Sequence, residues 1–151
     1  MRKQCRRKVY ALVNPVSFAM QGAAITPDED LNKLRVRELA AIDAFSRGAA
    51  TIQDWNSVVA ILNLTEQLAR SGVGPEALPA CELAQAYLIN TKEVFEATRQ
   101  MGTSDAGLDA FRDLYEWHDL QRQSISRSRY ERAIQTTRAR VMNRAPGVVE
   151  L

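Results

Sequence analysis

The sequence predicts an all-α protein, a compact bundle of five or six helices with a basic N-terminal arm and an arginine-rich C-terminal helix. Segments with apolar residues at three- and four-residue spacing follow one another along the 151 residues, each between a helix-start signal and a stop. Only residues 9–13 resemble a strand, and a single strand has no partner. Short connections between the helices favour antiparallel neighbours.

The chain length predicts one domain with three parts. Residues 1–13 form the basic N-terminal arm, residues 14–143 the helical bundle and residues 144–151 a C-terminal tail. The two cysteines are too few for a disulfide framework, and no apolar run reaches the ~20 residues of a membrane helix. We therefore expect a cytoplasmic protein that does not bind membranes.

The first two helices are predicted from their start signals. Asn14-Pro15 supplies a cap and a first helical proline for a short helix that ends before Gly22. The segment Thr26–Glu29 is a capping box with proline at the first helical position. It opens a helix that we expect to reach Arg47 and to stop at Gly48.

The next two helices have equally clear boundaries. The segment Thr51–Asp54 opens the third helix, which Gly72 ends. Pro79 predicts the start of the fourth helix, which we expect to run to Met101, before Gly102. The inward face predicted for this helix is Leu83, Ala84, Tyr87, Leu88, Val94 and Phe95.

The last part of the chain predicts two further helical segments. Apolar periodicity resumes after Ser104 and lapses at residues 121–124. Ser126 is a good N-cap for residues 127–143, which form a separate terminal helix or a kinked continuation of the fifth. The apolar stripe of this terminal helix predicts docking on the bundle or on a second subunit, as in a homodimer.

Enzyme chemistry has little support. His118, the only histidine, lies at the edge of an apolar helical face and predicts a core residue with a partnered ring nitrogen. The exposed face of the same helix carries a row of acids that predicts a solvated surface: Asp105, Asp109, Asp113 and Glu116. We expect no catalytic residue, no metal and no cofactor.

The charges are unevenly distributed. Residues 1–8 carry five cations and no acid, residues 9–121 carry eight cations and 16 acids, and residues 122–151 carry seven arginines and two acids. Guanidinium groups bind phosphate bidentately, so the basic ends predict contact with nucleic acid. The candidate residues are Arg6, Arg7, Lys8, Arg127, Arg129, Arg132, Arg138 and Arg140.

Other interpretations of these cations remain open. They can be solvated, paired with the acids of the chain itself, or aimed at an acidic protein partner. A helix-turn-helix would use residues 108–121 and 127–143 as its two helices.

Three segments carry a resemblance to known proteins. They are RRKVYALVNP at 6–15, LRVRELAAI at 34–42 and YEWHDLQ at 115–121. Together they resemble small phage and prophage proteins of Gram-negative bacteria, some of which are labelled Fis-like transcription regulators. The resemblance covers most of the chain, implies an accessory or regulatory role and assigns no functional residue.

The sequence thus predicts a non-enzymatic phage-type accessory or regulatory protein that contacts DNA or RNA through its basic ends. The alternative is a protein-binding module that inhibits or recruits a host factor, for example an anti-defence protein.

Overall fold

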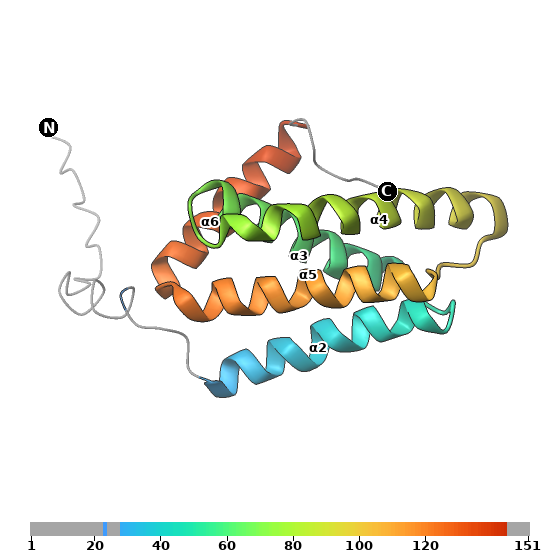
Figure 1. Cartoon of the computed structure of the whole chain (residues 1–151), viewed down its shortest axis with the longest axis horizontal. Coiled ribbons are helices and arrows are strands. Elements are labelled where there is room, and N and C mark those ends of the chain that lie inside the picture. The colour runs from blue at the N-terminus through green and yellow to red at the C-terminus, as the bar shows by residue number, and fades with distance from the viewer. Residues whose placement is uncertain (1–22, 24–27, 145–151) are drawn as a thin grey trace, which may run out of the picture.

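The computed structural model describes residue 23 and residues 28–144 of the chain. This part contains five α-helices, a short 3-10 helix and no β-strand (Figure 1). The elements are α2 (Asp28–Ser46), α3 (Ile52–Arg70), η1 (Pro75–Ala77), α4 (Leu78–Thr98), α5 (Asp105–Ser124) and α6 (Arg127–Met142). The all-helical prediction is confirmed, and none of these helices has the length and apolarity that a bilayer span requires. The basic arm, the predicted helix after Asn14-Pro15 and residues 145–151 lie outside the described residues.

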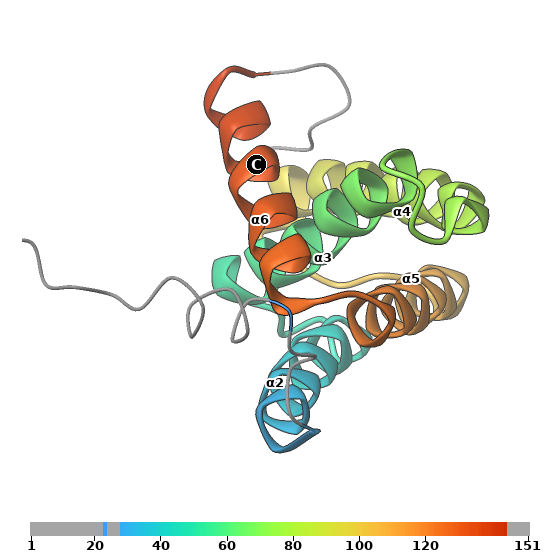
Figure 2. The ribbon, with the colours of Figure 1, turned by 90° about the vertical axis from the view of Figure 1, so that its left-hand side faces the viewer.

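Helices α2, α3, α4 and α5 form the body of the bundle, and α6 lies across it (Figure 2). Short connections make consecutive helices of the body antiparallel (Figure 1). Helix α3 occupies the centre, because it packs against α2, α4, α5 and α6. Helix α6 rests chiefly on α3, which leaves much of its surface in solvent.

Side-chain caps start α3, α5 and α6, and those at Thr51 and Ser126 stand where the sequence predicts them. Thr51 forms a complete capping box, in which its hydroxyl accepts from the backbone N–H of Asp54 at 3.2 Å and the Asp54 carboxylate accepts from the Thr51 N–H at 2.8 Å. Ser104 caps α5 by accepting from the Gly107 N–H at 3.2 Å. Each such cap stabilises its helix by ~1 kcal/mol.

The main core lies between α2, α3, α4 and α5. Phe45, Trp55, Leu88 and Phe111 are buried there, and the rings of Phe45 and Phe111 meet edge to face with centroids 5.4 Å apart. Each such side chain contributes ~1.5–3 kcal/mol by leaving water. A second, smaller cluster holds α6 against α3 and the loop after it, and it contains Leu68, Val73, Ile125, Tyr130 and Ala133.

The end of α4 differs from the prediction. The helix stops at Thr98 rather than Met101, because Arg99 adopts a left-handed conformation with φ of 60° and its N–H donates to the Phe95 carbonyl at 2.8 Å. Gly102 does not end the helix. It allows a close approach of two loops, because a Cβ there would lie 2.8 Å from the Cα of Gly48. The loops after α2 and α4 therefore touch backbone to backbone.

The inward face predicted for α4 is wrong in part. Leu83 is 50% exposed and Val94 is 42% exposed, so both lie on the outside of the bundle. Small side chains take the inward positions, namely Ala80, Cys81 and Ala84, together with Leu88 and Thr91. The reason is packing distance, since small residues let α4 approach α3 and α5 closely.

Candidate nucleic-acid interface

Helix α6 carries the arginines that the sequence singles out, and its attachment to the bundle sets where they point. Ser126 caps the helix, and its hydroxyl accepts from the Arg129 N–H at 3.4 Å. Ala133 is buried against α3, while the stripe predicted to dock is half-buried: Tyr130, Ile134, Thr137 and Val141. One side of α6 is therefore fixed to the bundle and the opposite side faces water.

A buried histidine links the base of α6 to α5 and α3. The His118 ring has no exposed surface, its Nδ1 lies 3.2 Å from Thr65 Oγ1 and its Nε2 lies 3.2 Å from the Tyr130 hydroxyl. The Thr65 hydroxyl donates to the Ile61 carbonyl at 2.7 Å, so it accepts from Nδ1–H, and Nε2 accepts from Tyr130. Burial, together with the nearby Arg122 cation, lowers the pKa of His118 to about 3. The expected partnered core histidine is confirmed.

A buried ion-pair network braces the end of α5, just before α6 begins. Arg122 is 2% exposed and donates to both carboxylate oxygens of Glu38, at 2.9 and 3.0 Å, and to Asp119 at 2.8 Å. Arg35 of α2 adds a second guanidinium to the Asp119 carboxylate at 2.9–3.0 Å. We call Arg35, Glu38, Asp119 and Arg122 the α2–α5 ion network.

The pKa values within the α2–α5 ion network follow from this geometry. Burial alone would raise the pKa of Asp119, but hydrogen bonds from Arg35 and Arg122 outweigh it and hold that pKa below its usual value. Burial alone would lower the pKa of Arg122, and its carboxylate partners reverse the effect and raise it. All of these charges neutralise one another inside the fold, so none is available to a ligand.

The α6 arginines have a different environment. Arg127 pairs with Glu131 on its own helix, with 3.0 Å between Nε and Oε1. Arg129, Arg132 and Arg138 are exposed and form no ion pair with a carboxylate within residues 28–144. The acidic row on the outer face of α5 does not reach them, and Asp109 in that row pairs instead with Arg112 at 3.7 Å.

Arg129 and Arg132 border a hollow of about 250 Å³ between α6 and the end of α3. Arg129 donates to the Ser71 carbonyl at 3.4 Å, and Arg140 donates to the Gln67 side-chain oxygen at 3.3 Å. We call this the arginine hollow, which is lined by Gln67, Leu68, Ser71, Arg129, Arg132, Ala133 and Thr136. Two neighbouring guanidinium groups are a donor set that binds a phosphate. The Ser71 and Thr136 hydroxyls donate instead to the Leu68 and Arg132 carbonyls, at 2.8 and 3.0 Å.

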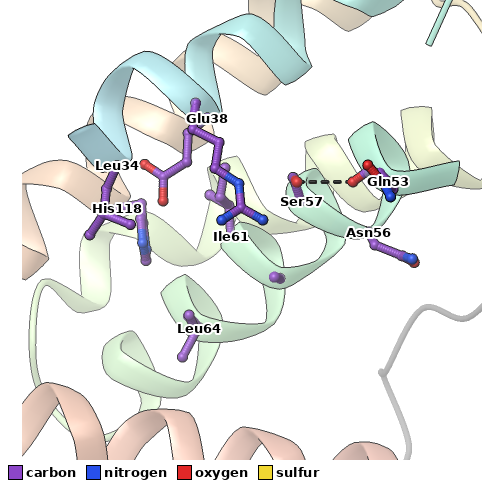
Figure 3. A pocket seen from close by; sticks show the side chains of 10 residues that line it. Leu34, Glu38, Gln53, Asn56, Ser57, Ile61, Leu64 and His118 are labelled. Carbon is purple, nitrogen blue, oxygen red and sulfur yellow. Dashed lines mark hydrogen bonds between the residues drawn. The ribbon is translucent and has the colours of Figure 1, made fainter. Parts of the chain in front are cut away.

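A larger hollow of about 460 Å³ lies between α2 and α3 (Figure 3). Figure 3 shows Leu34 and Glu38 on α2 opposite Ile61 and Leu64 on α3, with Ser57 hydrogen-bonded to Gln53. Its titratable groups are Arg37, Glu38 and His118. Glu38 is already engaged by Arg122, and His118 by Thr65 and Tyr130. This hollow therefore offers no free acid–base pair.

Other reactive groups give no site in the described part of the chain. Burial raises the pKa of the Cys81 thiol to about 12, so it stays protonated at neutral pH. Within residues 28–144, no three side chains of the His, Cys, Asp and Glu types are placed to hold a metal ion.

The helix-turn-helix alternative gains no support. Helix α5 continues to Ser124, and only Ile125 and Ser126 separate it from α6. That motif uses a turn of three or four residues and packs its two helices against each other, whereas α6 packs chiefly on α3. The terminal helix is separate rather than a kinked continuation, since Ile125 is extended with φ of −125°.

The basic residues predicted to bind nucleic acid thus fall into three groups by location. Arg129, Arg132 and Arg140 gather around the arginine hollow and its Gln67, whereas Arg127 and Arg138 lie on the other flank of α6. Arg6, Arg7 and Lys8 lie outside the described residues.

Sequence reasoning missed three polar residues of the arginine hollow, Gln67, Ser71 and Thr136. No local signal marks them, since the hollow exists only because α6 folds back on α3. No family model, curated protein or solved structure matches this chain.

Proposed function

We propose that this protein is a non-enzymatic nucleic-acid-binding protein and that the arginines of α6 contact the phosphate backbone of DNA or RNA. The observation that carries the proposal is the exposure of Arg129, Arg132 and Arg138 without a carboxylate partner in residues 28–144. The chain contains 18 acidic residues. Nevertheless, none of the acidic residues within residues 28–144 forms an ion pair with these three arginines.

The dimensions of α6 suit a nucleic-acid backbone. The helix rises about 16 Å between Arg129 and Arg140, which equals roughly five base steps along one strand of a duplex. The arginine hollow holds one phosphate between Arg129 and Arg132, and Arg140 meets a phosphate further along. The basic residues Arg6, Arg7 and Lys8 add backbone contacts from the N-terminal arm.

These contacts depend on the charge and spacing of the phosphates, and they do not distinguish one base sequence from another. The protein therefore binds nucleic acid with little sequence preference, in the accessory or regulatory role that the resemblance to phage and prophage proteins implies.

Fluorescence anisotropy with labelled duplex DNA, single-stranded DNA and duplex RNA tests the proposal at ~50 mM salt, where phosphate contacts are strong. The double variant Arg129→Gln/Arg132→Gln removes two cations of the arginine hollow and keeps good helix formers. We expect it to bind at least tenfold more weakly than the wild type.

The matched control is Arg47→Gln/Arg112→Gln, which removes the same charge from two exposed arginines elsewhere on the bundle. We expect it to keep most of the wild-type affinity. Equal losses in both double variants would reduce the effect to net charge and overturn the assignment to α6. Absence of binding to every probe would overturn the nucleic-acid function and leave the protein-binding alternative.

A further inference from the structure

An apolar cleft lies on the flank of α6 away from the arginine hollow. It has a volume of about 320 Å³ and is walled by α3 and the distal half of α6. We call it the α3–α6 cleft, and its lining is Asn56, Val59, Ala60, Asn63, Thr137, Arg138, Val141 and Met142. Met142 is 84% exposed at its edge. An open apolar surface of this kind is typical of a protein contact rather than a phosphate contact.

The cleft also contains polar atoms without partners. Asn63 is 5% exposed, and its Oδ1 has no hydrogen-bond partner; the same holds for Oγ1 of Thr137. An unpaired buried polar group costs ~1–3 kcal/mol. An occupant that brings both apolar side chains and a hydrogen-bond donor would remove this cost.

The rim of the cleft is positively charged. Arg138 lines the cleft, and Arg37 lines the adjoining α2–α3 hollow, which shares Asn56 and Ala60 with it. Neither arginine forms an ion pair within residues 28–144. Glu38, the one acid in these linings, is already bound by Arg122. The occupant is therefore expected to carry acids beside its apolar residues.

The outer face of α4 has this character. At 100° per residue five of its exposed apolar and amide side chains fall within an arc of ~80°; they are Leu83, Ala86, Asn90, Val94 and Ala97. A sixth, Ile89, is 46% exposed and lies outside this arc, on the acidic side of the helix. Three exposed acids fill the neighbouring ~60° of the helix; they are Glu82, Glu93 and Glu96. Nothing in the described part of the chain covers this face.

We propose that the outer face of α4 in one copy of the chain docks in the α3–α6 cleft of a second copy. Leu83 and Val94 then leave water against Val59 and Val141, and the Asn90 amide supplies a donor to the cleft that holds Asn63. The three glutamates lie beside Arg37 and Arg138. One contact thus uses two surfaces that the isolated bundle leaves unpartnered.

The two contact surfaces are different patches of the same molecule, so the interface is heterologous. It produces a closed ring or an open chain of copies rather than a two-fold dimer. The arginine hollow lies on the other flank of α6 and stays open in such an assembly. The two proposed contacts share Arg138, whereas Arg129 and Arg132 of the arginine hollow serve nucleic acid alone.

Sedimentation velocity on nucleic-acid-free full-length protein, over a wide range of concentration, tests the association. We expect the mean mass to rise with concentration and to fall with added salt, because glutamate–arginine pairs contribute. Val94→Lys on the α4 face and Ala60→Arg in the cleft each reduce the protein to a monomer. Leu120→Lys, at an exposed position on α5, leaves association unchanged and serves as the control.

Mixing the two monomeric variants gives the decisive result. Val94→Lys keeps an intact cleft and Ala60→Arg keeps an intact α4 face, so we expect them to form a one-to-one heterodimer that grows no further. A heterodimer also shows that both variants are folded.

Three results would overturn the proposal. They are a wild type that stays monomeric at every concentration, association that survives Val94→Lys, and two folded variants, with the helical circular dichroism of the wild type, that do not pair when mixed.

Discussion

Two neighbouring helices use arginine in opposite ways. Arg122, in the last turn of α5, is enclosed by Glu38 and Asp119, whereas Arg129 and Arg132 on α6 face water without a carboxylate partner in residues 28–144. The side chains are chemically identical and lie close together in the sequence. What separates them is whether α2, far away in the chain, brings a carboxylate to the same place.

The comparison shows how a fold divides its charges between structure and binding. A buried cation is tolerated only with partners, and removing a partner leaves an uncompensated charge. An exposed cation costs little to keep and contributes little to stability. We therefore assign Arg122 to folding and the α6 arginines to a ligand, and the following predictions test that division from the largest expected effect to the smallest.

The largest effect is expected from Arg122→Met. The substitution leaves the half-buried carboxylates of Glu38 and Asp119 without this cation, and the free energy of unfolding should fall by ~3–5 kcal/mol. Urea denaturation measures it. The matched control is Arg129→Met, which we expect to change the unfolding free energy by no more than ~0.5 kcal/mol. An equal loss of unfolding free energy in the two variants would contradict the assignment of Arg122, but not Arg129, to stability.

The next effect is a dependence of stability on pH that originates at His118. Its folded pKa of about 3 lies below the ordinary value of 6.5, so the unfolded chain binds a proton that the folded chain excludes. Stability is therefore complete above about pH 6.5 and falls as the pH drops, by up to ~1.4 kcal/mol per pH unit. Asp119, whose folded pKa is also lowered, adds a loss at still lower pH.

Urea denaturation of the wild type and of His118→Gln across this pH range isolates the histidine. We expect the variant to be less stable at neutral pH but to lose less stability on acidification than the wild type. Parallel pH profiles for the two proteins would show that His118 is not the group that titrates.

A smaller effect is expected from Ser126→Ala, which removes the N-cap of α6 and should lower stability by ~1 kcal/mol. Ser128→Ala keeps the cap and removes only the hydroxyl that lies 3.2 Å from Ser126 Oγ, so its effect is expected to be smaller. The thermal unfolding midpoints of the two variants measure the difference. Equal shifts would mean that the Ser126 cap contributes nothing specific to α6.

Local features of the fold could be predicted from the sequence. The start of α3 at the Thr51 capping box, the helix that resumes after Ser104, the N-cap Ser126 and the buried His118 all follow from spacing within one or two turns. These signals act over a few residues, so the sequence contains them completely.

Features that depend on contacts between distant residues could not be predicted. The pairing of Arg122 with Glu38 joins residues 84 positions apart, and periodicity places Arg122 in a polar stretch instead. The inward face of α4 could be predicted only in part, because the small side chains of Ala80 and Cys81 pack inward in place of Leu83 and Val94. The arginine hollow, likewise, requires that Ser71 at the end of α3 meet Arg129 on α6.

The salt dependence of duplex DNA binding tests the division of arginines most directly. Each phosphate contact contributes about 0.9 to the slope of log K against log salt. The account predicts that Arg129→Gln/Arg132→Gln lowers the magnitude of the wild-type slope by about 2 and leaves the urea midpoint unchanged. A slope equal to that of the wild type would contradict it.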